Sequence, residues 1–324
     1  MRYKEKALFC FFLFFTCFNT HAMSPLPTRA QTPLLQSYFI PAAPNTNHQS
    51  GWSVAQALYI TNTYQVDNSS NENLIIDVEN TRFDLQINYR KELWHFNLNI
   101  PFINNRAGFL DQSIDGWHDT FALPQGGRDN ALNDQINLHY DRSGNVIIDT
   151  QQPSGGVGDI QLAAGYQLTP TSQLWFGLEL PSSSSSEFIS NQSIDFALWY
   201  SLTTDSTTKR FFAYTTLGIS FPADSGLLKG LVNSQFGFAQ IGLNYSFTPS
   251  IALILQSDIH TPIVSDSKLD ALGVSFQTQF GLSFPTLFEQ HMLELFFSED
   301  VLPGHAPDIT FGFRVYPFQK SVLD

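Results

Sequence analysis

The sequence predicts an all-β protein: an antiparallel transmembrane β-barrel of about 12 strands with one long structured external loop. Two observations favour this fold class. Much of the chain alternates between apolar and polar side chains, which is typical of strands with one oily and one wet face. The links between these stretches alternate between short and long, as they do in bacterial outer-membrane barrels.

The N-terminus has the layout of an export signal. A basic start precedes an apolar run over 7–18 and a small-residue cleavage site ending at Ala22. This layout predicts a secretory signal peptide over 1–22, with a lipoprotein signal acylated at Cys17 as the alternative. The chain's two cysteines, Cys10 and Cys17, lie inside it. The exported chain would then have no thiol for a zinc-thiolate site or a cysteine nucleophile.

Charge and composition narrow the class further. Removing the signal takes away three bases and one acid, which leaves 13 basic and 28 acidic residues and a net charge of −15. Such a surface repels nucleic acid. Charged residues make up only 14% of the chain, against roughly a quarter in soluble domains. Beyond the signal no stretch approaches the ~20 apolar residues of a membrane helix. A soluble β-sandwich and an outer-membrane barrel are the two folds left.

The alternation is clearest over 272–284. The even positions read Leu, Val, Phe, Thr, Phe, Leu, Phe and the odd ones Gly, Ser, Gln, Gln, Gly, Ser, between Leu272 and Phe284. If the apolar face meets lipid, Phe276 and Phe280 point outward and Gln277 and Gln279 inward. Runs of this kind predict strands near 52–65, 74–90, 93–101, 158–168, 172–181, 192–203, 209–220, 234–247, 250–261, 271–284, 290–299 and 307–318.

The connections favour the barrel over the sandwich. Short turns such as "RKE" and "TPTS" alternate with long polar links such as "DNSSNEN" and "PSSSSSEFISNQ". A sandwich has no reason to sort its loops in this way. The barrel is expected to span 51–318, after an extended segment over 23–50 and before a short tail over 319–324. The extended segment is proline-rich and could be a plug in the lumen or a periplasmic strap.

The longest link, over 102–157, is expected to fold as a lid on the barrel, since a link of this length usually has structure and a task. Residues 114–123 predict a short helix, ended by Pro124. The stretch "INLHYDRSGNVIIDT" predicts a hairpin about "DRSGN". This link also carries an unusual cluster, "DGWHDTFALPQGGRD", over 115–129.

"GFLDQSIDGWHDTFALPQGGRD", followed by "SGGVGDIQLAAGYQL", resembles an uncharacterised proteobacterial family that is known only as a domain of unknown function. The likeness is most specific over the loop and the next strand and looser over the remaining barrel. It implies an outer-membrane barrel with the same loop signature. It implies no activity.

Two interpretations of the loop cluster are open. In the first, Trp117 packs the lid, and Arg128 binds Asp115, Asp119 or Asp129 to hold the loop shut. In the second, His118 acts as a catalytic base beside a carboxylate. His118 and Asp119 are adjacent, however, so on a helix they point about 100° apart and do not pair directly. We therefore assign the six residues to the lid and none to catalysis.

Strand parity also predicts which charged side chains line the lumen. They are Asp84, His95, Glu179, Asp195, Asp258, His260, Glu294 and Arg314. Five carboxylates against one arginine would make an acidic interior that favours cations. Each carboxylate can instead belong to a satisfied polar network.

The function expected from these features is a passive channel or transporter for small solutes in the cell outer membrane, with a loop lid. The alternatives are an outer-membrane hydrolase acting on lipid or peptide and a non-catalytic surface barrel. The expected partners are outer-membrane lipid, the barrel assembly machinery and a small solute. We expect no cofactor, no metal and no nucleic acid.

Overall fold

The computed structural model describes residues 25–27, 31–41, 50–121, 132–183, 188–204, 210–248, 250–288, 291–300 and 304–317. The predicted signal peptide, with the alternative acylation site Cys17, and the predicted tail over 319–324 lie outside these residues. So do Arg128 and Asp129 of the loop cluster.

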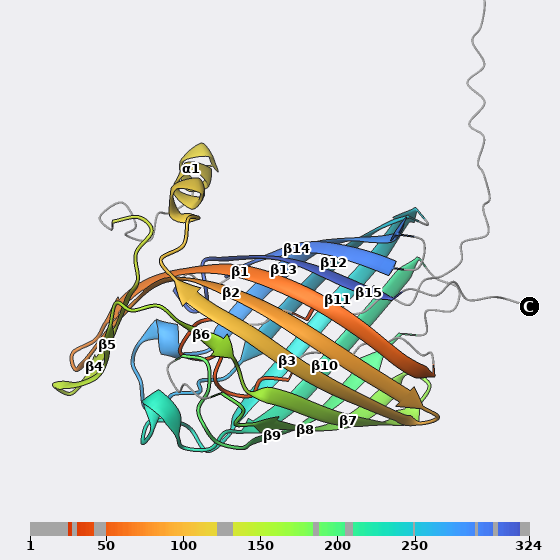
Figure 1. Ribbon diagram of the computed structural model, residues 1–324, viewed down its shortest axis with the longest axis horizontal. Coiled ribbons are helices and arrows are strands. Elements are labelled where there is room, and N and C mark those ends of the chain that lie inside the picture. Colours follow the sequence, from red (N-terminus) through yellow and green to blue (C-terminus); the bar gives the residue numbers. More distant parts are fainter. Residues whose placement is uncertain are drawn as a thin grey trace, which may run out of the picture.

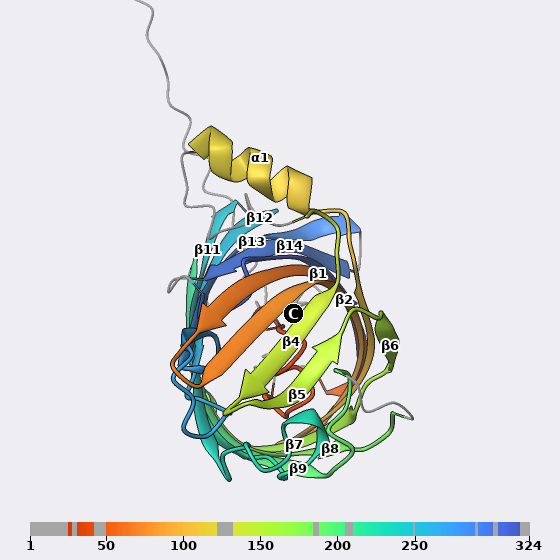
Figure 2. The same cartoon turned by 90° about the vertical axis from the view of Figure 1, so that its left-hand side faces the viewer.

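Twelve antiparallel strands of the described chain close into a ring (Figure 1 and Figure 2). β1 pairs with β2 on one side and with the last strand, β15, on the other, so the ring has no free edge. The ring strands are β1 (Gly51–Asn68), β2 (Glu72–Lys91), β3 (Trp94–Arg106), β7 (Ile160–Thr169), β8 (Ser172–Leu180), β9 (Asp195–Thr203), β10 (Phe211–Phe221), β11 (Phe236–Thr248), β12 (Ile251–His260), β13 (Ser275–Phe288), β14 (His291–Asp300) and β15 (Ile309–Pro317).

The two ends of the ring differ. Short links join β2 to β3, β7 to β8, β11 to β12 and β13 to β14 at one end, which we call the turn end. In Figure 1 it lies on the right, where β1 begins and β15 ends. The opposite loop end carries α1 (Asp111–Phe121), β4 (Asn137–Arg142), β5 (Asn145–Thr150), β6 (Ser154–Val157), η2 (Gly226–Leu228) and η3 (Asp270–Leu272). The alternation of short and long links is therefore as predicted.

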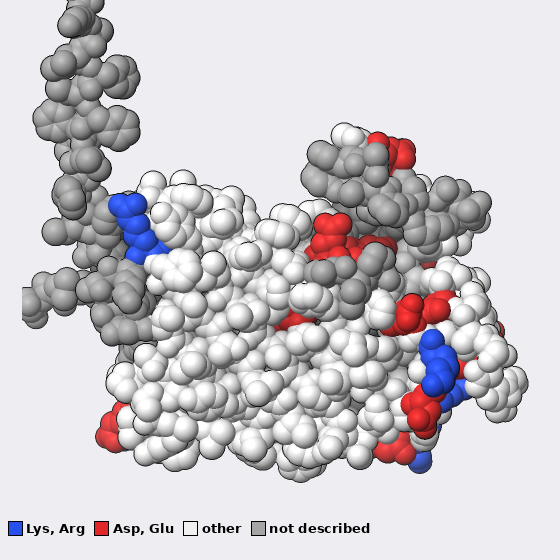
Figure 3. Space-filling model, turned by 180° about the vertical axis from the view of Figure 1, so that it is seen from behind, with Lys and Arg blue, Asp and Glu red and all other residues white. Residues whose placement is uncertain are grey.

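The two faces of each strand meet different surroundings. On β13 the side chains of Gln277 and Gln279 are 1% and 0% exposed, whereas Phe280 is 42% exposed. The middle of the barrel side in Figure 3 is nearly free of charged side chains, which gather toward the loop end. The apolar face therefore points outward and the polar face inward, as the alternation predicts.

A bulge interrupts the wall beside β3. The β3–β7 ladder ends at Asn99 opposite Gln161, and the β3–β6 ladder resumes at Phe102 opposite Val157. Two residues of β3 thus face three residues of the neighbouring chain, which is the signature of a β-bulge. Pro101 lies at this point and has no N–H to donate. Its carbonyl accepts a hydrogen bond from the Gly158 N–H at 2.9 Å.

The long link has the predicted content with shifted bounds. The helix runs over Asp111–Phe121 and begins three residues earlier than expected. The hairpin is present as β4 and β5, with Arg142 paired to Asn145 across its turn. Within the described residues no helix has the length and apolarity to cross a membrane.

Candidate functional site

The N-terminal segment, residues 25–27 and 31–41, lies among the inward-facing side chains of the barrel. The Leu26 N–H donates to Oε1 of Gln256 at 2.9 Å, and Nε2 of Gln256 donates to the Leu26 carbonyl at 3.1 Å. The Leu26 side chain is fully buried and packs with Tyr59 and Phe296 of the barrel. Of the two positions that the sequence left open for this segment, the described part occupies the interior.

A second set of contacts holds residues 36–39. The Phe39 N–H donates to Asp195 at 3.3 Å, and the Ser220 hydroxyl donates to the Phe39 carbonyl at 2.6 Å. The Tyr38 hydroxyl donates to the carbonyl of Ser225 at 3.2 Å. None of these contacts is a backbone ladder between the segment and a wall strand. Most of them are hydrogen bonds from side chains of the barrel to the backbone of the segment.

Inward aromatic rings leave room for the segment because they lie against glycines of neighbouring strands. Gly165 pairs with Trp175, and a Cβ added at Gly165 would meet the indole at 2.5 Å. A Cβ at Gly177 would meet the Phe39 ring at 2.8 Å. Trp175 also stacks on Trp199, with ring centroids 5.7 Å apart. Glycine at these positions thus lets large rings lie flat along the wall, with Phe39 against them.

Little space is left beside the segment. A cavity of about 30 Å³ lies between it and the wall, lined in part by Gln36, Tyr38, Arg82 and Asp84. A water needs roughly 10–15 Å³ on this measure, so the cavity holds one or two waters. This cavity between described residues is therefore too small for an organic solute.

All eight charged or histidine residues predicted to line the lumen are buried. The Arg82 guanidinium donates to Asp84 at 2.8 Å, and Nε of Arg314 donates to Glu294 at 2.7 Å. Glu294 also accepts a hydrogen bond from the Tyr316 hydroxyl at 2.9 Å. Two of the five carboxylates are therefore paired with arginines.

The other three carboxylates take part in amide networks. Asp258 accepts from Gln240 at 2.7 Å and from Gln256 at 3.0 Å. Glu179 accepts from the Gln161 amide at 2.8 Å. Asp195 accepts from the Ala223 N–H at 2.8 Å as well as from the Phe39 N–H.

The two histidines lie in the same interior. His95 packs against the Trp175 ring at 5.0 Å between centroids. Nδ1 of His260 lies 3.0 Å from the Thr261 carbonyl oxygen. Within the described residues no group of three or more His, Cys, Asp or Glu side chains has a metal-binding arrangement.

The count of one interior arginine was wrong. Arg82 and Arg90 are also buried, at 7% and 8% exposure, on the face of β2 that carries Asp84. Both have the parity of Asp84, so strict counting from that residue would have found them. The apparent change of phase near Asn80 hid this signal. The interior thus contains at least three arginines beside its carboxylates.

Hairpin β4–β5 lies across the loop end of the barrel (Figure 2). Its apolar side chains Leu138, Tyr140 and Ile148 belong to a buried cluster with Leu228 and Leu269 from other loops. β4 also extends the barrel wall, since it pairs with β2 from Asp77 opposite Asn137 to Glu72 opposite Arg142. The hairpin is thus both a cover and a continuation of the sheet.

The buried Glu72 carboxylate fastens this cover. It accepts hydrogen bonds from the Tyr140 hydroxyl at 2.8 Å and from the Lys268 N–H at 2.8 Å. Nε of Arg142 lies 3.4 Å from the same carboxylate, and Nη1 of Arg142 donates to the Ser265 carbonyl at 2.8 Å. Burial raises the pKa of the Tyr140 phenol, and its hydrogen bond to Glu72 acts in the same direction.

Helix α1 lies beside the rim in Figure 2, not across the opening. Its first residue, Asp111, is buried and accepts from the Asn62 amide and from the Asp134 N–H, both at 2.7 Å. Trp117 and His118 fall on this helix, where Asp115 is half-buried and Asp119 is exposed. The structure thus separates the helix of the predicted lid from its hairpin.

A family model described as "Protein of unknown function (DUF3187)" matches residues 6–314. The chain belongs to this family. The predicted resemblance to an uncharacterised family is therefore confirmed, and the loop signature stays a prediction. No curated protein matches the DUF3187 chain.

Solved structures resemble the DUF3187 barrel in fold. An outer membrane channel of Pseudomonas putida F1, described as COG4313, has a TM-score of 0.55 at 11% identity and covers 88% of this chain and 98% of its own. The toluene transporter TodX of Pseudomonas putida has a TM-score of 0.43 at 9% identity and covers 93% and 100%. The first likeness shows that the DUF3187 chain has the fold of an outer-membrane channel barrel.

Proposed function

We propose that this DUF3187 protein is an outer-membrane channel for small solutes, with residues 25–27 and 31–41 as a plug that closes it. The observation that carries the proposal is how the plug is held. Gln256 and Ser220 reach in from the wall and bind its backbone through side chains. Its own backbone hydrogen bonds, such as Leu35 N–H to Thr32 carbonyl at 3.1 Å, form local turns. The plug can therefore leave without opening a ladder of the wall.

The wall supports a membrane location. Its outward face is apolar, and its ring leaves no strand edge for lipid to solvate, which is what a membrane barrel requires. The expected signal peptide and the fold shared with a protein described as an outer membrane channel support the same location. In the usual orientation the turn end faces the periplasm, so the plug enters from that side.

The polar interior supports a passage for solutes. Moving the plug would uncover Gln256, Asp195 and the stacked Trp175 and Trp199, a lining with both hydrogen-bonding and apolar groups. We infer that hairpin β4–β5 is the loop lid, a fixed cover that narrows the opposite end and does not close it. Helix α1, with Trp117 and His118, has no gating role in this proposal because it lies beside the rim.

Conductance in planar bilayers tests the proposal. The chain without residues 23–41 should fold, because the wall ladders close without them. Its time-averaged conductance should exceed that of the intact chain by at least about tenfold, which corresponds to a shift of ~1.4 kcal/mol between closed and open forms. Heat-modifiable migration in detergent gels would show that both proteins are folded. Folded barrels that conduct in neither form would contradict the proposal.

A further inference from the structure

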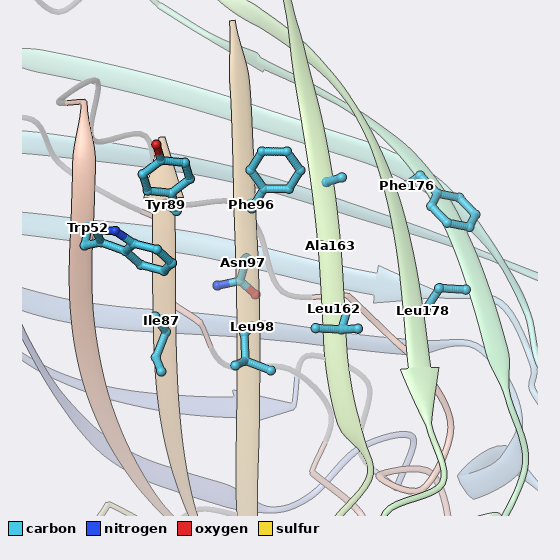
Figure 4. Close-up of a pocket in the computed structure, with 11 residues that line it drawn as sticks. Trp52, Ile87, Tyr89, Phe96, Asn97, Leu98, Leu162, Ala163, Phe176 and Leu178 are labelled. Atoms are coloured by element: carbon cyan, nitrogen blue, oxygen red, sulfur yellow. The ribbon is translucent and has the colours of Figure 1, made fainter. Parts of the chain in front are cut away.

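A hollow lies in the outer wall near the turn end. It has a volume of about 490 Å³ and extends over β1, β2, β3, β7 and β8, with Trp52, Tyr89, Phe96 and Phe176 among its lining residues (Figure 4). This volume falls within the roughly 300–1,000 Å³ of small-molecule sites. The hollow is on the apolar face of the wall, so the plug and the lumen do not form it.

One small residue creates the hollow. Strand register places Trp52 opposite Tyr89, Tyr89 opposite Phe96, Phe96 opposite Ala164, and Ala164 opposite Phe176. Ala164 thus occupies the one position in this row that has no aromatic side chain. Phe96 and Phe176 are two strand spacings apart, about 9–10 Å. The gap between them is an apolar slot with a methyl group as its floor.

The walls of the slot are braced by other rings. Trp52 and Tyr89 have centroids 4.6 Å apart, and Phe96 stacks on Trp94 at 6.1 Å. Tyr and Trp at the end of a membrane barrel are typical of the level where lipid headgroups begin. The slot therefore starts at the headgroup level and extends toward the middle of the wall.

A second hollow, of about 470 Å³, continues from the first at the β2–β3 turn. It shares Tyr89 and Phe96 with the slot and is also lined by Trp94, Lys91 and Glu92. Lys91 and Glu92 are both exposed, so they can meet a ligand with one positive and one negative group. The apolar slot and the charged rim together match a molecule with a hydrocarbon chain and a zwitterionic head.

We propose that this groove binds one phospholipid with a zwitterionic aminophosphate headgroup. An acyl chain lies in the slot over Ala164, the phosphate lies near the Lys91 ammonium, and the lipid amine lies near the Glu92 carboxylate. The inference rests on the membrane location in the proposed function, but it is independent of the plug. Loss of lipid binding and loss of conductance are therefore separate results.

Native mass spectrometry of the intact, detergent-purified barrel tests the slot, with palmitoyl-oleoyl phosphatidylethanolamine as the probe. Ala164→Leu fills the slot, and Ala213→Leu is the matched control, an outward alanine of β10 outside the hollow. Wild type and Ala213→Leu should retain one lipid, and Ala164→Leu should weaken retention by about tenfold, as expected for losing two buried CH₂ groups. Heat-modifiable migration would show that each variant is folded.

The headgroup is tested with the same lipid, its phosphatidylglycerol counterpart and palmitoyl-oleoyl glycerol. Lys91→Gln should lower the retention of phosphatidylethanolamine toward that of palmitoyl-oleoyl glycerol, which has no phosphate headgroup. Lys229→Gln at the loop end should leave this retention unchanged. Glu92→Gln should remove the preference for phosphatidylethanolamine over phosphatidylglycerol. Equal retention by the two leucine variants would overturn the proposal. So would a dimer that Ala164→Leu converts to monomer without change in bound lipid, because a second copy would then fill the groove.

Discussion

The two closures of the barrel are built differently. Hairpin β4–β5 at the loop end continues the ladder of β2 and seals a buried apolar cluster with its Leu138 and Tyr140 side chains. The N-terminal segment lies deeper, yet its backbone is bound by side chains such as Gln256 and Ser220. A ladder opens only by losing several hydrogen bonds together, whereas the hydrogen bonds from wall side chains to the segment can be exchanged one by one for water. The segment also shares the buried apolar cluster of the hairpin through Leu34, Leu35, Tyr38 and Phe39, and these contacts must separate when it moves. The more deeply buried of the two segments is therefore not necessarily the fixed one. We propose that the N-terminal segment moves and that hairpin β4–β5 stays in place.

Removing each closure separately gives the largest expected difference. Replacing 137–150 by a short glycine linker should leave time-averaged conductance in planar bilayers close to wild type, because the plug still fills the lumen. Removing 23–41 should raise it by at least about tenfold. If the hairpin deletion alone opened the pore to that extent, the assignment of fixed and moving parts would be reversed.

The contrast requires that the wall register is correct, and arginine substitutions on β13 test it. Phe280 pairs with Leu255 on the lipid side near the middle of β13, and Gln277 pairs with Asp258 inside. A charge at the lipid-facing midplane costs ~2–4 kcal/mol. Phe280→Arg should therefore sharply reduce assembly into the outer membrane, and Gln277→Arg, opposite a carboxylate, should reduce it far less. Equal losses, measured as the heat-modifiable fraction, would indicate a register slip of one residue.

Loosening a single plug contact should have a smaller effect. Gln256→Leu leaves the Leu26 N–H and carbonyl without their side-chain partner, and an unsatisfied buried group costs about 1–3 kcal/mol. Open probability in single-channel records should rise by about tenfold. Gln277→Leu is the matched control, since Gln277 is equally buried on the next strand and its amide makes no hydrogen bond to the described residues of the plug. The same rise in both variants would mean that general loosening, not plug release, opens the pore.

The smallest effect is expected at Glu72, the carboxylate that holds hairpin β4–β5. Glu72→Gln keeps an acceptor for the Tyr140 hydroxyl but removes the charge beside Arg142. Amide hydrogen exchange of Leu138 and Tyr140 should become faster, while open probability should stay at the wild-type value. A change in open probability without faster exchange at β4 would show that Glu72 acts on the plug instead.

The wall could be predicted because its rule is local. A strand between lipid and a polar interior must alternate, and the sequence over 275–284 does so. The rule fails on β2 before Thr81, where five consecutive residues over 76–80 are buried. There the outer face is covered too, since Glu79 accepts hydrogen bonds from the Phe109 and Leu110 N–H groups. Because both faces of the strand are covered here, the alternation of polar and apolar residues is lost. For this reason Arg82 was not predicted as an interior residue.

The plug could not be assigned from sequence, because its contacts are long-range. Leu26 and Gln256 are 230 positions apart, and nothing periodic in the segment marks its partner. The long link over 102–157 could be predicted in part. Its hairpin has a local turn signal and was found, whereas the separation of α1 from β4–β5 depends on how both pack on the rim. Interior charges were located by parity, but their partners, such as the Gln240 amide on Asp258, were not.

The most direct test locks the plug reversibly. The chain's two cysteines both lie in the predicted signal peptide, so Phe39→Cys with Ser220→Cys introduces a single pair. The Ser220 hydroxyl already lies 2.6 Å from the Phe39 carbonyl, which brings the two residues close enough to attempt a disulfide. Planar-bilayer current is recorded from the oxidised protein before and after dithiothreitol. Our account predicts a silent oxidised form and a conducting reduced form, and equal current before and after reduction of a confirmed disulfide would contradict it.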